Sequence, residues 1–111
     1  MNHSLSEKVT PEKLAKYFDV TYRALSKVKI GEKRNINWKK SAEDFLDMAQ
    51  RYFDDAHHFA KQGNIVTAFA ALNYAHGWLD AGARLGLFDV DGDNVLFTVD
   101  KEYAESLTNI K

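Results

Sequence analysis

The segment from Ile65 to Leu85 constrains the fold more than any other part of the chain, because it is apolar or small on almost every side. A helix with that pattern is expected to be buried on most sides. Gly77 and Gly82 each cost about 1 kcal/mol of helix propensity relative to alanine, and close packing against a neighbour is the expected compensation. We therefore predict that this segment is the central helix of a bundle.

An amphipathic helix is predicted before this segment. Thr10 can cap its first turn, and Pro11 fits the first helical position because its missing N–H has no partner there. Apolar residues then recur at steps of three and four and gather on one face. We expect this helix to end at Gly31.

The next helix is expected to begin between Asn37 and Ser41, with Ser41 and Asp44 forming a capping box. Gly63 predicts its end and Asn64 the N-cap of the central helix. So short a connection makes these two helices antiparallel neighbours.

The remaining C-terminal sequence is different in pattern. Phe88–Val90 and Val95–Val99 are short β-type runs on either side of Asp-Gly-Asp-Asn, a sequence typical of a hairpin turn. The predicted fold is all-α: an up-and-down three-helix bundle with a short C-terminal β-hairpin. As one domain of 111 residues, it divides into a flexible arm (1–9), the bundle (10–86), the hairpin (87–100) and a tail (101–111).

Composition excludes several classes of site. The chain has no cysteine, so it holds no disulfide, zinc–thiolate site or thiol nucleophile. The first eight residues are polar and lack the apolar core of a signal peptide. No apolar run approaches the roughly 20 residues that span a bilayer. We expect a cytoplasmic protein that does not associate with membranes.

Charge is distributed unevenly although the net charge is only −1. Residues 1–40 contain 10 Lys/Arg and 4 Asp/Glu, a balance of +6, whereas residues 41–111 contain 5 and 12, a balance of −7. Such asymmetry can steer a nucleic acid to the basic half. We favour a different interpretation, in which the basic first helix lies against the acidic second helix or two chains associate through opposite faces.

A family resemblance is carried by Asp54-Asp55-Ala56 and by the stretch Tyr74-Ala75-His76-Gly77-Trp78-Leu79-Asp80-Ala81-Gly82-Ala83-Arg84-Leu85-Gly86-Leu87. With these residues the chain resembles a small archaeal family catalogued as domain of unknown function 357. The resemblance runs from about Ser41 to Phe97, so the first helix falls outside it. It implies an up-and-down three-helix bundle and no assigned activity.

Four polar residues of the central helix form the first candidate site. They are spaced by three, four and four, which aligns them along one edge of a helix. Such a stripe is suited to a ligand pocket or an acid–base pair, but a polar seam that fixes helix register, or an exposed strip at the one unburied edge, explains the same residues. Its members are Asn73, His76, Asp80 and Arg84.

The acidic turn is the second candidate, as a divalent-cation site. Residues 89–100 can be aligned with a calcium-binding EF-hand loop, in which several oxygens converge on a hard cation. Asn94 stands where that loop has glycine, and Phe97 offers no side-chain ligand. A β-hairpin with a solvated acidic tip explains the same residues. The metal-ligating set would be Asp89, Asp91, Asp93 and Asp100.

A basic loop is the third candidate, as a nucleic-acid contact. Lysines beside an exposed aromatic ring can hold a phosphate backbone and stack a base, although the same ring can cover the end of a bundle. The residues are Lys33, Arg34, Trp38, Lys39 and Lys40.

No motif of an enzyme is present: there is no phosphate-binding glycine loop, nucleophile elbow or metalloprotease helix. We expect a non-catalytic protein-interaction module without a cofactor, whose partner is another protein or a second copy in a homodimer. The alternatives are a module that binds a small ligand or divalent cation, and a weak nucleic-acid binder.

Overall fold

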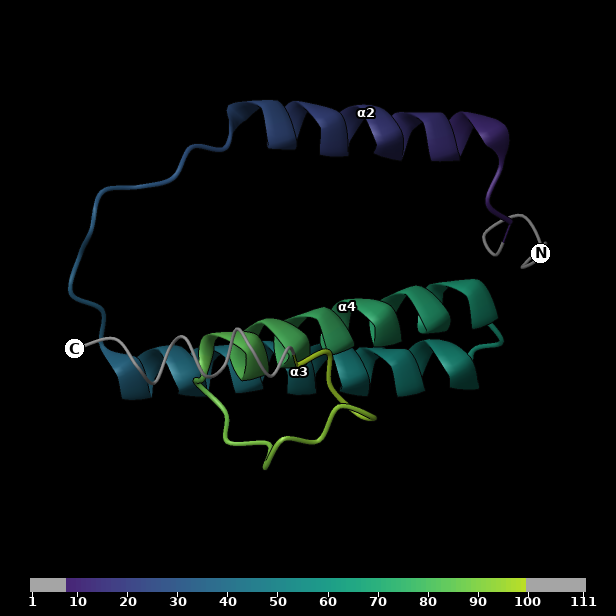
Figure 1. The fold of residues 1–111 in the computed structure, drawn as a ribbon. Helices are drawn as coiled ribbons and strands as arrows, with labels where there is room; N and C mark the ends of the chain where they lie inside the picture. The colour runs from purple at the N-terminus through teal and green to yellow at the C-terminus, as the bar shows by residue number, and fades with distance from the viewer. Residues whose placement is uncertain (1–7, 100–111) are drawn as a thin grey trace. The chain divides into compact units, whose positions relative to one another are not determined.

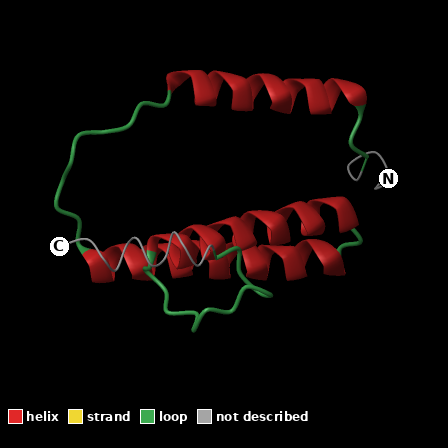
Figure 2. Cartoon of the chain, in the orientation of Figure 1, coloured by secondary structure: helices red, strands yellow, loops and turns green. Residues whose placement is uncertain are grey.

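The computed structural model describes residues 8–99, and this part of the chain is all-α. It contains α2 (Pro11–Lys27), α3 (Trp38–Lys61) and α4 (Ile65–Leu85), without a β-strand between residues 8 and 99 (Figures 1 and 2). None of these helices combines the length and hydropathy that a bilayer-spanning helix requires. The chain forms two compact units, residues 1–35 with α2 and residues 36–111 with α3 and α4.

Helix α2 begins as predicted and ends earlier than predicted. The Lys13 amide donates to Thr10 Oγ1 at 3.1 Å, and Pro11 occupies the first turn. The predicted end at Gly31 is wrong, because the helix stops at Lys27 and Val28 is extended. Val28 and Ile30 are β-branched, which favours extended backbone. Every described residue from Lys8 to Asn35 is exposed.

Asn37 caps the start of α3. Its Oδ1 accepts a hydrogen bond from the Lys40 amide at 2.9 Å, so the predicted capping box of Ser41 and Asp44 is wrong. Asparagine caps as well as serine does, and Asn37 stands one turn earlier, which allows Trp38 and both lysines after it to join the helix.

Gly63 makes the connection between α3 and α4, as predicted. Its φ is +82°, and the Asn64 amide donates to the Phe59 carbonyl at 2.9 Å. Asn64 holds the N-cap position of α4, but its side chain makes no capping hydrogen bond. The turn reverses the chain, and Figure 1 shows α3 and α4 antiparallel and side by side.

Alanine forms most of the core of the α3–α4 hairpin. Small side chains keep the two helix backbones close and displace the large side chains to the two edges of the contact. The buried alanines are Ala49 and Ala56 of α3 with Ala68, Ala71, Ala75 and Ala83 of α4.

One edge of the hairpin is aromatic. Phe45 packs edge-on against Trp78 with ring centroids 5.0 Å apart, and Tyr52 packs edge-on against Tyr74 at 4.4 Å. Edge-to-face pairs of this kind add about 0.5–1.5 kcal/mol each beyond the area they bury.

The expectation that α4 is buried on most sides is wrong for the described residues. Its buried alanines and Gly82 face α3 or the following segment, whereas Ile65, Phe69 and Leu72 remain exposed.

The predicted β-hairpin is wrong for residues 87–99; Asp100 and the predicted tail lie outside the described residues. The turn itself forms, with positive φ at Asp91 and Gly92 and a hydrogen bond from the Asp93 amide to the Val90 carbonyl at 3.0 Å. The flanking runs do not pair, because other acceptors take their amides. The Phe88 amide donates to the Gly82 carbonyl, and the Val95 amide to a carboxylate oxygen of Asp93.

The two glycines of α4 are expected to respond in opposite ways to alanine. A Cβ on Gly82 would collide with the Phe88 ring, whereas a Cβ on Gly77 would meet no atom within 4 Å, so the predicted close packing is confirmed at Gly82 and wrong at Gly77. Gly82→Ala should therefore destabilise the protein, and Gly77→Ala should stabilise it by up to about 1 kcal/mol. Urea denaturation followed by circular dichroism measures both, and a stabilising Gly82→Ala would contradict the packing described.

Candidate functional site

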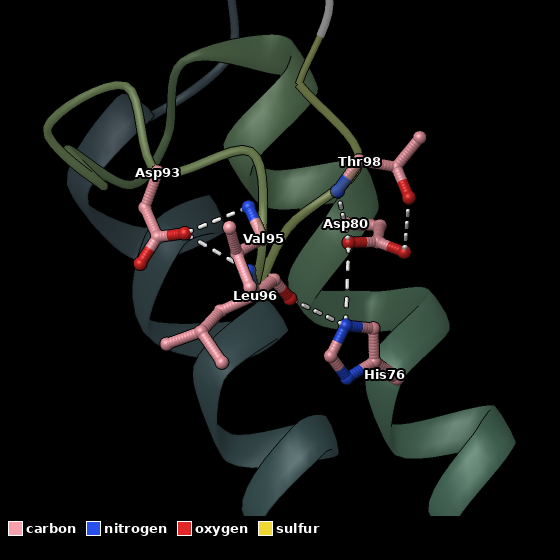
Figure 3. Close-up of polar contacts among 6 residues, drawn as sticks. All are labelled: His76, Asp80, Asp93, Val95, Leu96 and Thr98. Carbon is pink, nitrogen blue, oxygen red and sulfur yellow. Dashed lines mark hydrogen bonds and ion pairs between the residues drawn. The ribbon is translucent and has the colours of Figure 1, made fainter.

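The polar stripe of α4 meets the segment that follows the helix. The chain leaves α4 at Gly86, where φ is +83°. Residues 88–99, here named the strap, then return along the helix. His76 and Asp80 both point toward the strap, and their partners are Leu96 and Thr98 (Figure 3). Two residues selected from helical spacing are thus brought together with two that lie about 20 positions later.

Asp80 binds both donors of Thr98. Its Oδ1 accepts from the Thr98 amide at 2.9 Å, and its Oδ2 accepts from the Thr98 hydroxyl at 3.2 Å. Only 28% of the Asp80 side chain is exposed. Hydrogen bonds to a charged acceptor in such surroundings are among the stronger ones in proteins. Asp80 is therefore the principal anchor of the strap.

His76 is a second anchor. Its Nε2 lies 2.7 Å from the Leu96 carbonyl oxygen and 3.6 Å from Asp80 Oδ1. A carbonyl oxygen has no proton to give, so Nε2 is the donor of the shorter contact. The Phe97 ring stacks on the imidazole at a centroid distance of 6.3 Å.

Asp93 shapes the strap from within. Its Oδ1 accepts from the amides of both Val95 and Leu96 at 2.9 Å (Figure 3). Asp89 does the same upstream, accepting from the Asp91 amide at 3.0 Å. Short acidic side chains in turns commonly bind the backbone two residues on.

The acidic turn does not gather its carboxylates. Between residues 8 and 99 no three histidine, aspartate or glutamate side chains are grouped so that they could hold a metal ion. Asp89 and Asp93 each direct an oxygen to the backbone, and Asp100 lies outside the described residues.

The other two members of the stripe lie in different surroundings. Asn73 lines a groove between α3 and α4, whereas Arg84 lines a cavity of about 420 Å³ at the start of the strap, together with Trp38 and Asp89. The stripe is therefore shared among three environments and does not form one pocket.

The groove has a volume of about 420 Å³ and lies on the edge of the hairpin away from the aromatic pairs. It is mostly apolar, with Gln50, Asn73 and His76 as its polar members. Its other lining residues are Leu46, Ala49, Phe53, Leu72, Ala75 and Leu79.

Sequence reasoning missed this groove. Its one available signal was the spacing of Leu46 and Phe53, seven residues apart and to one side of the main apolar face of α3. That spacing makes the apolar surface of the helix wider than a single neighbour can cover.

The basic candidates are divided between the two units. Lys33 and Arg34 belong to residues 1–35, whereas Trp38 starts α3. Half of Trp38 is exposed, and it shares its cavity with Asp89 and Asp91. Carboxylates beside the ring would repel a phosphate backbone, which disfavours base stacking at this tryptophan.

Asp80→Ala should release the strap while the hairpin stays folded. The Thr98 amide loses its acceptor, so its hydrogen exchange should accelerate about tenfold, corresponding to roughly 1–1.5 kcal/mol for the lost hydrogen bonds. Amides in the middle of α3 should keep their protection. Asp55→Ala, at an exposed position of α3, is the matched control. Unchanged exchange at Thr98 would show that Asp80 is not an anchor.

Comparison with known proteins identifies one family. A family model described as "Protein of unknown function (DUF357)" matches residues 16–88. The match begins inside α2, so the expectation that the first helix falls outside the resemblance is wrong. No curated protein and no solved structure matches the chain.

Proposed function

Because this chain belongs to the DUF357 family, whose description assigns no activity, we propose a function from its own surface. The protein is a non-catalytic protein-interaction module that acts by self-association into a homodimer. The groove of the α3–α4 hairpin is its interaction surface.

The observation that carries the proposal is the exposure of large apolar side chains around the groove. Leu46 is 54% exposed, Phe53 45% and Leu72 43%, and all three line the groove. Isolated exposed apolar residues are ordinary, but a contiguous group that lines a groove is typical of a binding surface. A groove between two helices is suited to the apolar face of a third helix.

The placement of the polar groups supports a non-catalytic role. His76 and Asp80 are the residues of the stripe best suited to acid–base chemistry, and both bind the strap. Among the described residues, their hydrogen bonds go to the backbone of the strap and to the Thr98 hydroxyl.

The up-and-down three-helix bundle stays a prediction and follows from the same surface. An apolar helix must cover the groove to complete such a bundle, because α3 alone leaves Leu72 and Phe69 of α4 uncovered. Self-association supplies that helix in the proposal.

Leu72→Glu should weaken the dimer, because it places a carboxylate in the apolar groove. Sedimentation equilibrium should show at least a roughly tenfold weaker association, as expected when binding loses about 1.4 kcal/mol or more. Ala70→Glu is the matched control, since Ala70 is an exposed residue of the same helix that does not line the groove. Circular dichroism should show that both variants keep their helices.

Two outcomes would contradict the proposal. A wild-type protein that stays monomeric at high concentration would remove the homodimer. If Leu72→Glu and Ala70→Glu weakened the dimer equally, the interface would not lie at the groove.

A further inference from the structure

We infer that the strap controls the groove. Attachment of the strap to α4 fixes the position of His76 in the groove wall, so that release of the strap weakens binding at the groove. This control rests on the proposed function, because the groove is the surface that it regulates. Its physical basis is the set of contacts made by His76 and the way in which the strap is held.

The imidazole of His76 belongs to the groove and contacts the strap. The ring lines the groove. Its Nε2 donates to the Leu96 carbonyl at 2.7 Å, and the Phe97 ring stacks on it with 27° between the two planes. A histidine side chain has two rotatable bonds, so a contact at the edge of the ring and another at its face restrict both. The strap therefore sets where this part of the groove wall lies.

Residues 95–98 of the strap are held to α4 largely by hydrogen bonds. Asp80 accepts from the Thr98 amide at 2.9 Å and from the Thr98 hydroxyl at 3.2 Å. Val95 is 89% exposed and Leu96 60%, so these apolar side chains bury little surface. Segments with few buried apolar contacts and exposed hydrogen bonds open at a small cost in free energy. This part of the strap therefore has an attached state and an accessible released state.

Release of the strap changes what His76 can bind. With the strap attached, Figure 3 shows the Leu96 carbonyl and a carboxylate oxygen of Asp80 both facing Nε2. Without the strap, Asp80 Oδ1 remains, but at 3.6 Å it lies beyond hydrogen-bond distance until the ring turns. A ring that turns to Asp80, or that donates to water, no longer occupies its place in the groove wall. The groove therefore has its observed shape when the strap is attached.

The direction of the control follows from this dependence. A second copy that fits the groove in its observed shape binds the attached state better, and it therefore favours attachment. Coupling between two binding events is reciprocal, so attachment of the strap strengthens self-association by the same factor.

Thr98→Pro tests the control without altering any residue that lines the groove. Proline has neither an N–H nor a hydroxyl, so Asp80 loses both of its donors on the strap. Sedimentation equilibrium should show self-association weakened about fivefold, the factor expected for one net hydrogen bond. Val95→Ala, at an exposed strap position, is the matched control and should associate as the wild type does. Wild-type association in Thr98→Pro would overturn the control.

His76→Phe tests whether the histidine transmits the effect. Phenylalanine keeps an aromatic ring but has no N–H to donate to the Leu96 carbonyl. In this background Thr98→Pro should weaken association no further, which a double-mutant cycle measures. Circular dichroism should show that the single and double variants keep their helices. A full fivefold loss in the His76→Phe background would show that the strap acts by another route, and the inference would be wrong.

The wild-type protein gives the reciprocal measurement. Hydrogen exchange of the Thr98 amide should slow about fivefold as the protein concentration rises through the transition from monomer to dimer. In Leu72→Glu, which impairs the groove, the exchange rate should not depend on concentration over the same range. Exchange at Thr98 that is independent of concentration in a wild-type protein that dimerises would contradict the control and leave the homodimer intact.

A wild-type protein that stays monomeric would contradict the proposed function, and the groove wall is then measured directly. Leu72 and Leu79 line the groove and lie four residues before and three residues after His76 on α4, so their methyl groups are its neighbours. Thr98→Pro should shift their NMR resonances, whereas Val95→Ala should not. Unchanged resonances in Thr98→Pro would show that the strap does not set the groove wall, and the inference would be wrong whether or not the protein dimerises.

Discussion

The alanine contact between α3 and α4 is the constraint on which the rest of this structure depends. Two helices can approach closely only where their facing side chains are small, and here alanines occupy most of the buried positions. Close approach leaves no room for large side chains in the contact itself. They lie at its two edges, where one edge is closed by aromatic pairs and the other remains open as the groove.

His76 links the groove to the strap. The imidazole lines the groove, and its Nε2 donates to the Leu96 carbonyl at 2.7 Å. Asp80, one turn further along α4, binds the amide and hydroxyl of Thr98. The strap therefore lies beside the surface proposed for binding. His76 and Asp80, two of the four residues that spacing alone would have assigned to a ligand or to an acid–base pair, bind the strap instead.

Local signals predicted the helices well and tertiary features poorly. Thr10, Gly63 and Gly86 mark helix boundaries because capping depends on residues within one turn of the chain. The prediction of a paired β-hairpin was wrong because strand pairing depends on residues that lie far away in the sequence. The sequence around Asp91-Gly92 makes the turn, but pairing of the flanking runs depends on competing acceptors such as Asp80, 18 residues before Thr98. The spacing of His76 and Asp80 identified half of the polar contact and could not identify its partners.

The amino-acid sequence by itself determined that the chain is helical and where α4 begins and ends; it predicted a close neighbour for both Gly77 and Gly82, and only Gly82 has one. These properties follow from hydrophobic periodicity, capping residues and side-chain size, all of which act over a few residues. Only the tertiary structure decided that Phe88 is that neighbour, that the strap binds α4 in place of pairing with itself, and that Leu46, Phe53 and Leu72 line one groove. Each of these depends on which side chains meet across the α3–α4 contact, and contacts between distant segments are not encoded in local spacing.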